Sequence, residues 1–91
     1  MPVAIRIPPT LRRYCDGADL LHVQPDTVAG AIDQLHRRFH GIRDRIVDDR
    51  GQIRGSVLVY VNEEDVRFLQ EQRTPLKPGD EVSIIPAFAG G

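Results

Sequence analysis

The sequence predicts an α+β domain in which a mixed sheet of four to five strands packs on one main helix. Apolar residues recur at helical spacing in residues 28–39, whereas they alternate or run continuously in segments near both ends of the chain. The chain has 91 residues, of which 41% are hydrophobic, which suits one domain with a modest core. A single helix with one apolar stripe must bury that stripe against a sheet face, so these segments belong to one domain.

The first two strands are predicted at residues 3–7 and 19–23, where every second residue is aliphatic. Pro8 and Pro9 end the first strand, because proline has no amide hydrogen to donate to a ladder. Residues 11–17 are expected to form a loop. The two strands would then form a hairpin with a long connection.

The main helix is predicted to begin after Thr27, or failing that Asp26, whose side-chain oxygen can accept from a free amide of the first turn. Gly41 is a natural stop after the helix. Residues 42–47 fit a short second turn of helix, and residues 48–55 fit a polar loop. The predicted apolar stripe consists of Val28, Ala31, Ile32, Leu35 and Phe39.

Residues 57–61 are the strongest strand candidate, because nearly every position is β-branched or aromatic. We expect both faces of this strand to be covered, at least in a complex. Residues 62–65 are predicted to form a turn, and residues 66–74 an irregular segment with room for a short strand.

A last strand is predicted at residues 81–85, after a turn at residues 76–80, and Pro86 ends it. Residues 87–91 show neither strand periodicity nor a helix cap. We therefore expect a folded domain over residues 1–86 and a flexible Gly-Gly tail over residues 87–91.

The order of these elements is strand, strand, helix, strand, short strand, strand. A sheet built in this order places its first and last strands next to each other at the centre, with the helix across one face. This is the order of the β-grasp fold, which we take as the predicted fold.

The charge balance argues against nucleic acid as a partner, since 12 Lys+Arg face 13 Asp+Glu and leave a net charge of −1. The distribution is uneven, because residues 46–91 carry five basic and eight acidic side chains. This imbalance suggests that the C-terminal half is steered toward a basic partner surface.

No apolar run approaches the ~20 residues of a membrane span, and residues 1–6 do not resemble the start of a signal peptide. Cys15 is the one cysteine, so no internal disulfide can form. These features predict a cytoplasmic protein with no membrane partner, and we expect it to be a monomer when free.

Residues 25–28, 59–62, 76–82 and 84–91 carry a resemblance to a known family, and this resemblance spans essentially the whole chain. The sequence resembles the MoaD/ThiS family of ubiquitin-like sulfur carriers. Within that family, residues 62–68 and 86–91 most resemble the CysO-type carriers of cysteine biosynthesis.

This resemblance implies a specific chemistry at Gly91. An activating enzyme uses ATP to adenylate the Gly91 carboxylate, and a sulfur donor converts it to a thiocarboxylate. The sulfur then passes to an acceptor enzyme, which for CysO-type carriers is a pyridoxal-phosphate cysteine synthase, and a metalloprotease releases the product. The chain itself is implied to bind no cofactor and to act as a protein substrate, not as an enzyme.

The residues at the end of the chain suit this chemistry. An α-carboxylate is ionised at neutral pH, because its pKa is about 3.5, and can attack a phosphate. Gly90 and Gly91 lack a Cβ and fit a narrow channel, while Phe88 and Ala89 complete the tail. Five extended residues, 87–91, reach about 17 Å, which suffices to enter a buried active site.

Strand parity predicts a partner-binding patch near this tail. If alternate residues of 57–61 and 81–85 face the helix, the residues between them face outward. An exposed apolar patch on a small protein usually marks a partner site. The residues predicted to form this patch are Leu58, Tyr60 and Ile85.

Other reactive residues are assigned ordinary roles. Cys15 has an acidic neighbour and no feature that would activate it, so it is interpreted as a loop cysteine. His36 and His40 are one helical turn apart but lack a third ligand, so we expect no metal site. His22 is expected to be solvated, and residues 63–65 are interpreted as a wet turn with a possible partner-steering role.

Several functional alternatives stay open at this point. The same activation chemistry would serve a ubiquitin-like protein modifier that is joined to lysines through Gly91. Within sulfur transfer, the acceptor is open among cysteine, molybdopterin, the thiamine thiazole and a thio-metabolite. A scaffold β-grasp domain with no covalent chemistry is a third alternative.

Overall fold

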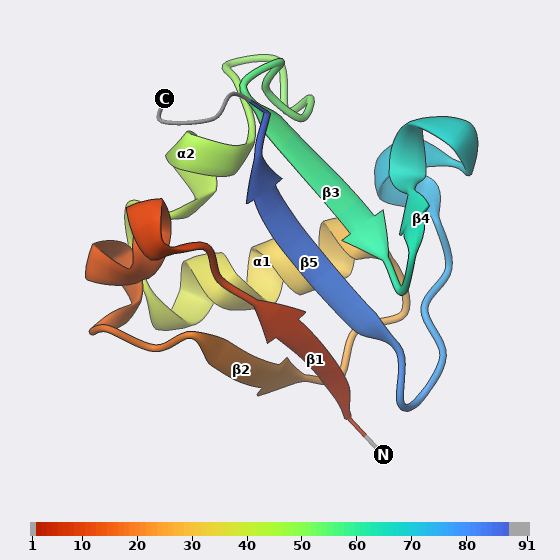
Figure 1. Cartoon of the computed structure of the whole chain (residues 1–91), viewed down its shortest axis with the longest axis horizontal. Helices are drawn as coiled ribbons and strands as arrows, with labels where there is room; N and C mark the ends of the chain where they lie inside the picture. The colour runs from red at the N-terminus through yellow and green to blue at the C-terminus, as the bar shows by residue number, and fades with distance from the viewer. Residues whose placement is uncertain (1, 88–91) are drawn as a thin grey trace.

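Two parallel strands form the centre of the sheet in the computed structural model, which describes residues 2–87 (Figure 1). β5 pairs with β1 on one side and with β3 on the other, and the strand order is β2-β1-β5-β3-β4. The fold is a β-grasp, as predicted, and its first and last strands are neighbours. The strands are β1 Val3–Arg6, β2 Leu20–Val23, β3 Val57–Val61, β4 Glu64–Asp65 and β5 Glu81–Pro86.

Alternate residues of each strand face the core, which lies between the sheet and α1 (Val28–Arg38). In β3, Val59 and Val61 are buried, whereas Leu58 and Tyr60 on the other face are only half-buried. The predicted parity is therefore confirmed, and the outer face of β3 is partly open in the chain alone. The strand residues that are buried in the core are Val3, Ile5, Leu21, Val23, Val59, Val61, Val82 and Ile84.

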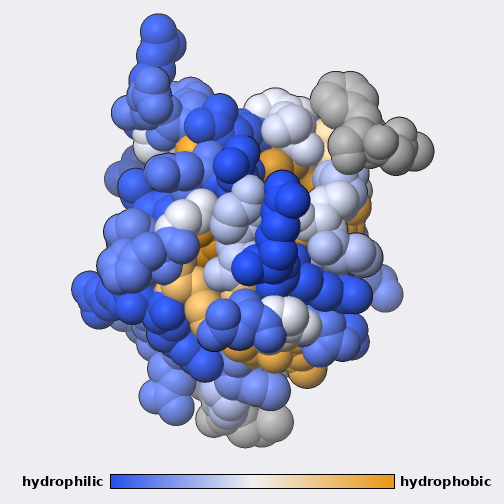
Figure 2. All heavy atoms as spheres, turned by 90° about the vertical axis from the view of Figure 1, so that its left-hand side faces the viewer, coloured by the Kyte–Doolittle hydropathy of each residue, from blue (hydrophilic) through white to orange (hydrophobic). Residues whose placement is uncertain are grey.

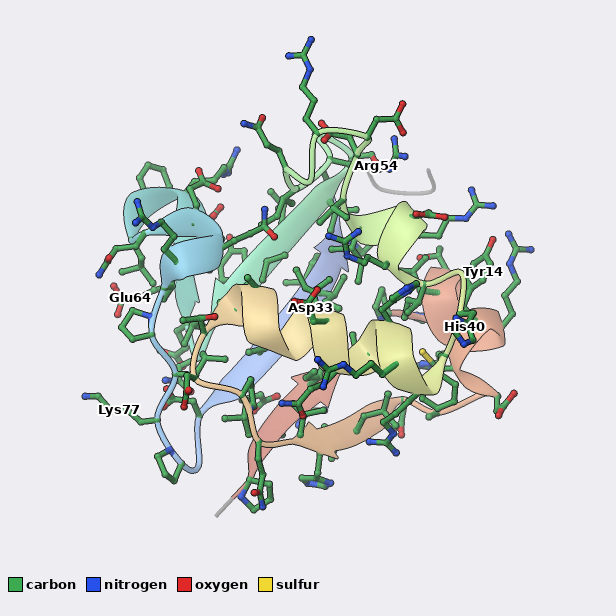
Figure 3. All side chains as sticks on the ribbon, turned by 180° about the vertical axis from the view of Figure 1, so that it is seen from behind. Tyr14, Asp33, His40, Arg54, Glu64 and Lys77 are labelled. Carbon is green, nitrogen blue, oxygen red and sulfur yellow. The ribbon has the colours of Figure 1, made fainter. Side chains whose placement is uncertain are left out.

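The helix α1 begins where the sequence predicts, because the Thr27 hydroxyl Oγ1 accepts from the Gly30 amide at 3.1 Å. A second free amide of the first turn, that of Val28, donates to the Thr74 carbonyl at 3.1 Å. Viewed from behind in Figure 3, α1 lies across the sheet with Asp33 on its exposed side. Its buried stripe consists of Val28, Ala31, Ile32 and Leu35, and Phe39 caps the helix while half-buried.

The cap at Thr27 gives a direct test of this helix start. Thr27→Ala removes the acceptor for the Gly30 amide and should lower the free energy of unfolding by about 1 kcal/mol. Chemical denaturation monitored by circular dichroism measures the change. Thr10→Ala is the matched control, because Thr10 is exposed. Equal stability of the Thr27 variant and the wild type would contradict the capping role.

After α1, the chain forms the expected short second helix, α2 (Arg43–Ile46). Gly41 lies at the predicted stop with φ +100°, a conformation that glycine adopts readily. Ile42, Ile46 and Val47 are buried beneath α2, so this segment belongs to the core. Among residues 2–87, every helix is too short or too polar to span a bilayer.

The segment predicted as a loop at residues 11–17 is instead largely helical. A 3₁₀ helix, η1, spans Pro9–Cys15, and it begins at a proline because proline is compatible with the first helical turn. Cys15 is fully buried, with 0% of its surface exposed. The expectation of a loop cysteine was wrong, since Cys15 packs in the core together with Leu11 and Tyr14 at its margin.

The predicted turn at residues 62–65 is shorter than expected. Asn62, with φ +57°, starts a tight turn, and the chain returns at once as β4 against β3. Two 3₁₀ helices follow, η2 (Val66–Phe68) and η3 (Glu71–Arg73). Asp65 is buried and not in a wet turn, because it lies opposite Tyr60 and pairs with Arg67.

Candidate functional site

The predicted attachment residue Gly91 lies outside the described residues, as do the predicted tail residues Phe88, Ala89 and Gly90. The structure does define where the described part of the chain ends. β5 ends at Pro86, and the Ala87 amide donates to the Ser56 carbonyl at 2.9 Å. Residue 87 is therefore held beside the start of β3, and we call this end of the β3–β5 pair the exit point (Figure 1).

The three residues predicted to form a partner patch lie together on the outer face of the sheet, near this exit point. Leu58 is the direct cross-strand neighbour of Ile85, and Tyr60 is the next residue of β3 on the same face. Ile85 is 38% exposed, while Leu58 and Tyr60 are half-buried. The structure thus brings the three side chains together, and their role in partner binding stays a prediction.

Three acidic side chains of the C-terminal half lie at the opposite end of the sheet. Glu63, Glu64 and Glu81 line one shallow hollow of about 470 Å³ beside the turn at Asn62. β5 starts at Glu81 and ends at Pro86, so about 17 Å of strand separates this hollow from the exit point. These three side chains therefore lie far along the sheet from the exit point, and the expectation that the acidic C-terminal half is steered toward a basic partner surface stays a prediction.

Basic side chains surround the exit point instead, and sequence reasoning missed them. Arg13 on η1 and Arg45 on α2 both lie over the ring of Tyr14, 5.2 and 5.1 Å from its centre. Figure 3 shows Tyr14 on η1 beside α2. The Arg-Arg-Tyr segment at residues 12–14 and the Arg-Asp-Arg segment at residues 43–45 were visible in the sequence, but their convergence depends on η1, which was expected to be a loop.

The side of the molecule that carries η1 and α2 is mostly hydrophilic, and apolar atoms show only in small openings between charged side chains (Figure 2). A hollow of about 250 Å³ lies between η1, α2, the start of β3 and the end of β5. Arg13, Tyr14 and Arg45 line it together with Pro86. We call this hollow the Tyr14 cleft.

Comparison with known proteins places this geometry in a family. The sequence profile of the ThiS family matches residues 6–91. The chain belongs to the ThiS family. The β-grasp fold and the exit of the chain beside β3 are thus features of a ThiS-family member, and the resemblance inferred from the sequence is confirmed.

Individual relatives narrow the comparison. The chain is 38% identical over 93 residues to the sulfur carrier protein CysO of Mycobacterium tuberculosis, and the match covers 100% of both chains. It is 34% identical over 65 residues to small archaeal modifier protein 3 of Haloferax volcanii, covering 71% of this chain and 70% of that protein. A chain in the crystal structure of the Amycolatopsis orientalis BexX/CysO complex matches at TM-score 0.91 and 37% identity, covering 98% and 99% of the two chains.

An ion pair borders the patch of this ThiS-family chain. Asp65 lies opposite Tyr60 on β3, and its Oδ2 pairs with Arg67 Nη2 at 2.7 Å. The side-chain hydrogen bond from Arg67 holds the pKa of the Asp65 carboxyl below its usual range, although burial opposes this shift. The pair fixes Arg67 at the edge of the outer face.

The lowered pKa predicts how stability depends on pH. Because the folded-state pKa is depressed, the Asp65 carboxylate stabilises the fold above the unfolded-state value of about 3.9, and this contribution is lost as pH falls through the lower folded-state value. Asp65→Asn should therefore lower the denaturation midpoint at about pH 7 and converge with the wild type near pH ~2. Denaturation at both pH values measures this, with Asp49→Asn as an exposed control. A pH-independent difference would contradict the assignment.

The remaining candidate residues do not form a reactive site among residues 2–87. Burial raises the pKa of the Cys15 thiol, with Asp16 adding to the rise and Arg38 opposing it, so the thiolate nucleophile is disfavoured. The rings of His36 and His40 meet edge to face with centroids 5.4 Å apart. No group of three metal-ligating side chains occurs within the described part of the chain.

Proposed function

We propose that this chain is a sulfur carrier of the CysO type, with the carboxylate of Gly91 as the site that carries sulfur. The observation that supports this most strongly is the match to CysO over the full length of both chains. The Gly90-Gly91 pair follows an exit point that lies beside an apolar patch on the outer face, which suits delivery of the end of the chain to another protein.

The chemistry follows from the carboxylate alone. Its oxygen attacks the α-phosphate of ATP and releases pyrophosphate, which leaves an acyl adenylate on Gly91. Hydrosulfide then attacks the carbonyl carbon, AMP leaves with its electron pair, and a thiocarboxylate remains. No oxidant or reductant is needed, since sulfur enters at the sulfide level.

This chain supplies position and access, and its partners supply catalysis. The outer-face patch gives the partner an apolar surface near the exit point, and residues 87–91 span about 17 Å when extended. We propose an ATP-dependent adenylating enzyme as the first partner and a cysteine-synthase-like acceptor as the second. A metalloprotease that releases the product is a third, and the setting is the cytoplasm. The carrier binds no cofactor, because ATP is consumed in the activating enzyme.

The test is a loading assay with intact-protein mass spectrometry. The chain is incubated with the adenylating enzyme encoded in the same genome, ATP and sulfide. The proposal expects a mass gain that corresponds to one sulfur replacing one oxygen, and this gain should depend on ATP. An unchanged mass with an enzyme that activates another carrier would overturn the proposal.

A protein modifier is the second candidate, because the chain is also similar to a small archaeal modifier protein. The same adenylate would then be attacked by a lysine amine of a target protein. Lys77 is the one lysine of this chain, so chains of linked copies would have to use it or the N-terminus. Isopeptide-linked Gly-Gly remnants on lysines of cell proteins would support the modifier role over the carrier role.

A further inference from the structure

The Tyr14 cleft has no part in the function proposed so far, yet it lies at the root of the tail. Pro86, the last residue of β5, lines the cleft together with Ser56, whose carbonyl accepts from Ala87. Any protein that takes up the end of the chain must therefore come close to this cleft. The cleft and the patch also share Ile85, so both belong to one continuous surface.

The two arginines of the cleft present positive charge that has no acidic partner within residues 2–87. The ion pairs of that part of the chain join Arg6 to Glu81, Arg43 to Asp33 and Arg67 to Asp65. No Asp or Glu lines the cleft. The charge of Arg13 and Arg45 is thus free to meet a ligand from outside.

The Tyr14 ring holds these two guanidinium groups in place. Arg13 donates from Nη2 to the Tyr14 hydroxyl at 3.3 Å, and both guanidinium groups lie within 5.2 Å of the ring centre. A guanidinium over an aromatic face keeps its planar set of donors available for a carboxylate. Ordering the side chains before binding also reduces the entropy that a partner must overcome.

We propose that the Tyr14 cleft receives carboxylate side chains from the rim of the adenylating enzyme's channel, with Arg13 and Arg45 as the recognising residues. This proposal rests on the proposed function. It names the chemistry of the first partner, which is acidic at the point where the tail enters.

The position of the cleft favours partner carboxylates over the phosphates of ATP as its ligand. The reacting carboxylate of Gly91 lies at the far end of residues 87–91, which span about 17 Å when extended. The nucleotide must therefore bind about one tail length away from the cleft. The cleft faces the entrance of the channel, where side chains of the enzyme surround the tail.

The acidic residues at the other end of the sheet support the same orientation. The cleft is basic, while Glu63, Glu64 and Glu81 lie at the opposite end of the β3–β5 ribbon. An acidic partner surface attracts the end that carries the cleft and repels the end that carries the three glutamates. Such steering raises association rates by roughly 10–10³-fold and weakens as ionic strength rises.

The test compares two double variants with the same change in net charge. Arg13→Glu/Arg45→Glu reverses the charge of the cleft. Arg50→Glu/Arg73→Glu reverses the charge of two exposed arginines that do not line the cleft. The assay measures ATP–pyrophosphate exchange by the wild-type adenylating enzyme at low salt. The concentration of the cleft variant that gives the half-maximal rate should be about tenfold or more above that of the wild-type carrier. Its rate at saturation should be unchanged, and the control should match the wild type. Circular dichroism confirms that both variants fold.

Each result separates the two proposals. If the wild-type chain is not activated at all, the proposed function fails. If the wild type is activated and the cleft variant reaches its half-maximal rate at the same concentration as the control variant, this inference fails while the proposed function stands. The cleft variant could instead raise the KM for ATP and leave the carrier concentration at the half-maximal rate unchanged. That result would show that the arginines act on the nucleotide, and it would also overturn the inference.

Discussion

Adding one alanine after Gly91 should abolish sulfur loading and leave the melting temperature unchanged. Among residues 2–87, the buried apolar residues run from Val3 to Ile84, and we expect a residue added beyond Gly91 to leave this core unchanged. Loading should fail because the addition moves the carboxylate by about 3.5 Å and carries a Cβ into a site shaped for glycine. A displacement of ~1 Å can already cost about a hundredfold in rate, so the expected loss is at least that large.

The loading assay with intact-protein mass spectrometry measures this result in the absence of any protease. Gly91→Ala is the companion variant, because it keeps the length of the chain and changes only the side chain. Loss of loading in both variants would show that the added Cβ is the cause. Loss of loading in the extended chain alone would show that the displaced carboxylate is the cause. An extended chain that gains sulfur as fast as the wild type would exclude Gly91 as the carrier site.

A charge placed in the outer-face patch should weaken partner binding strongly. Ile85→Asp puts a carboxylate beside Leu58 near the exit point, where we expect the partner to cover both side chains. The loss expected for a central interface residue is about 2 kcal/mol or more, which corresponds to roughly 30-fold in Kd. Binding of the adenylating enzyme, measured by calorimetry, tests this.

Leu20→Asp is a closely matched control for that variant. Leu20 is 37% exposed and Ile85 is 38% exposed, and both are apolar residues of the sheet. Leu20 lies on β2, at the edge of the sheet far from the exit point. Equal effects of the two substitutions would show that the partner does not distinguish the patch from the rest of the sheet, and the predicted role of the patch would be wrong.

Local patterns were enough to predict most of the fold. The apolar spacing of residues 28–35 and the hydroxyl of Thr27 define α1, because both act within one helical turn. Strand parity placed Leu58, Tyr60 and Ile85 on one face, since side chains alternate along any strand. These features depend on neighbours in the sequence, which a single sequence displays.

The features that escaped prediction depend on contacts between distant segments. Pro8 and Pro9 signal the end of a strand, but proline equally suits the first turn of a helix. The helical conformation of η1 is favoured because it buries Cys15 in the core. Asp65 is charged, yet pairing with Arg67 and its place opposite Tyr60 allow it to be buried. The Tyr14 cleft needs η1 and α2 to meet, and no local pattern shows that they do.

The central place of β5 has a consequence for how the protein is made. β5 is the last strand that the structure describes, and it is the strand through which β1 and β3 are joined in one sheet. The sheet therefore cannot close until residues 81–86 have been synthesised and have emerged from the ribosome. A chain broken off before β5 lacks the middle of its sheet, and such a fragment is exposed to proteolysis.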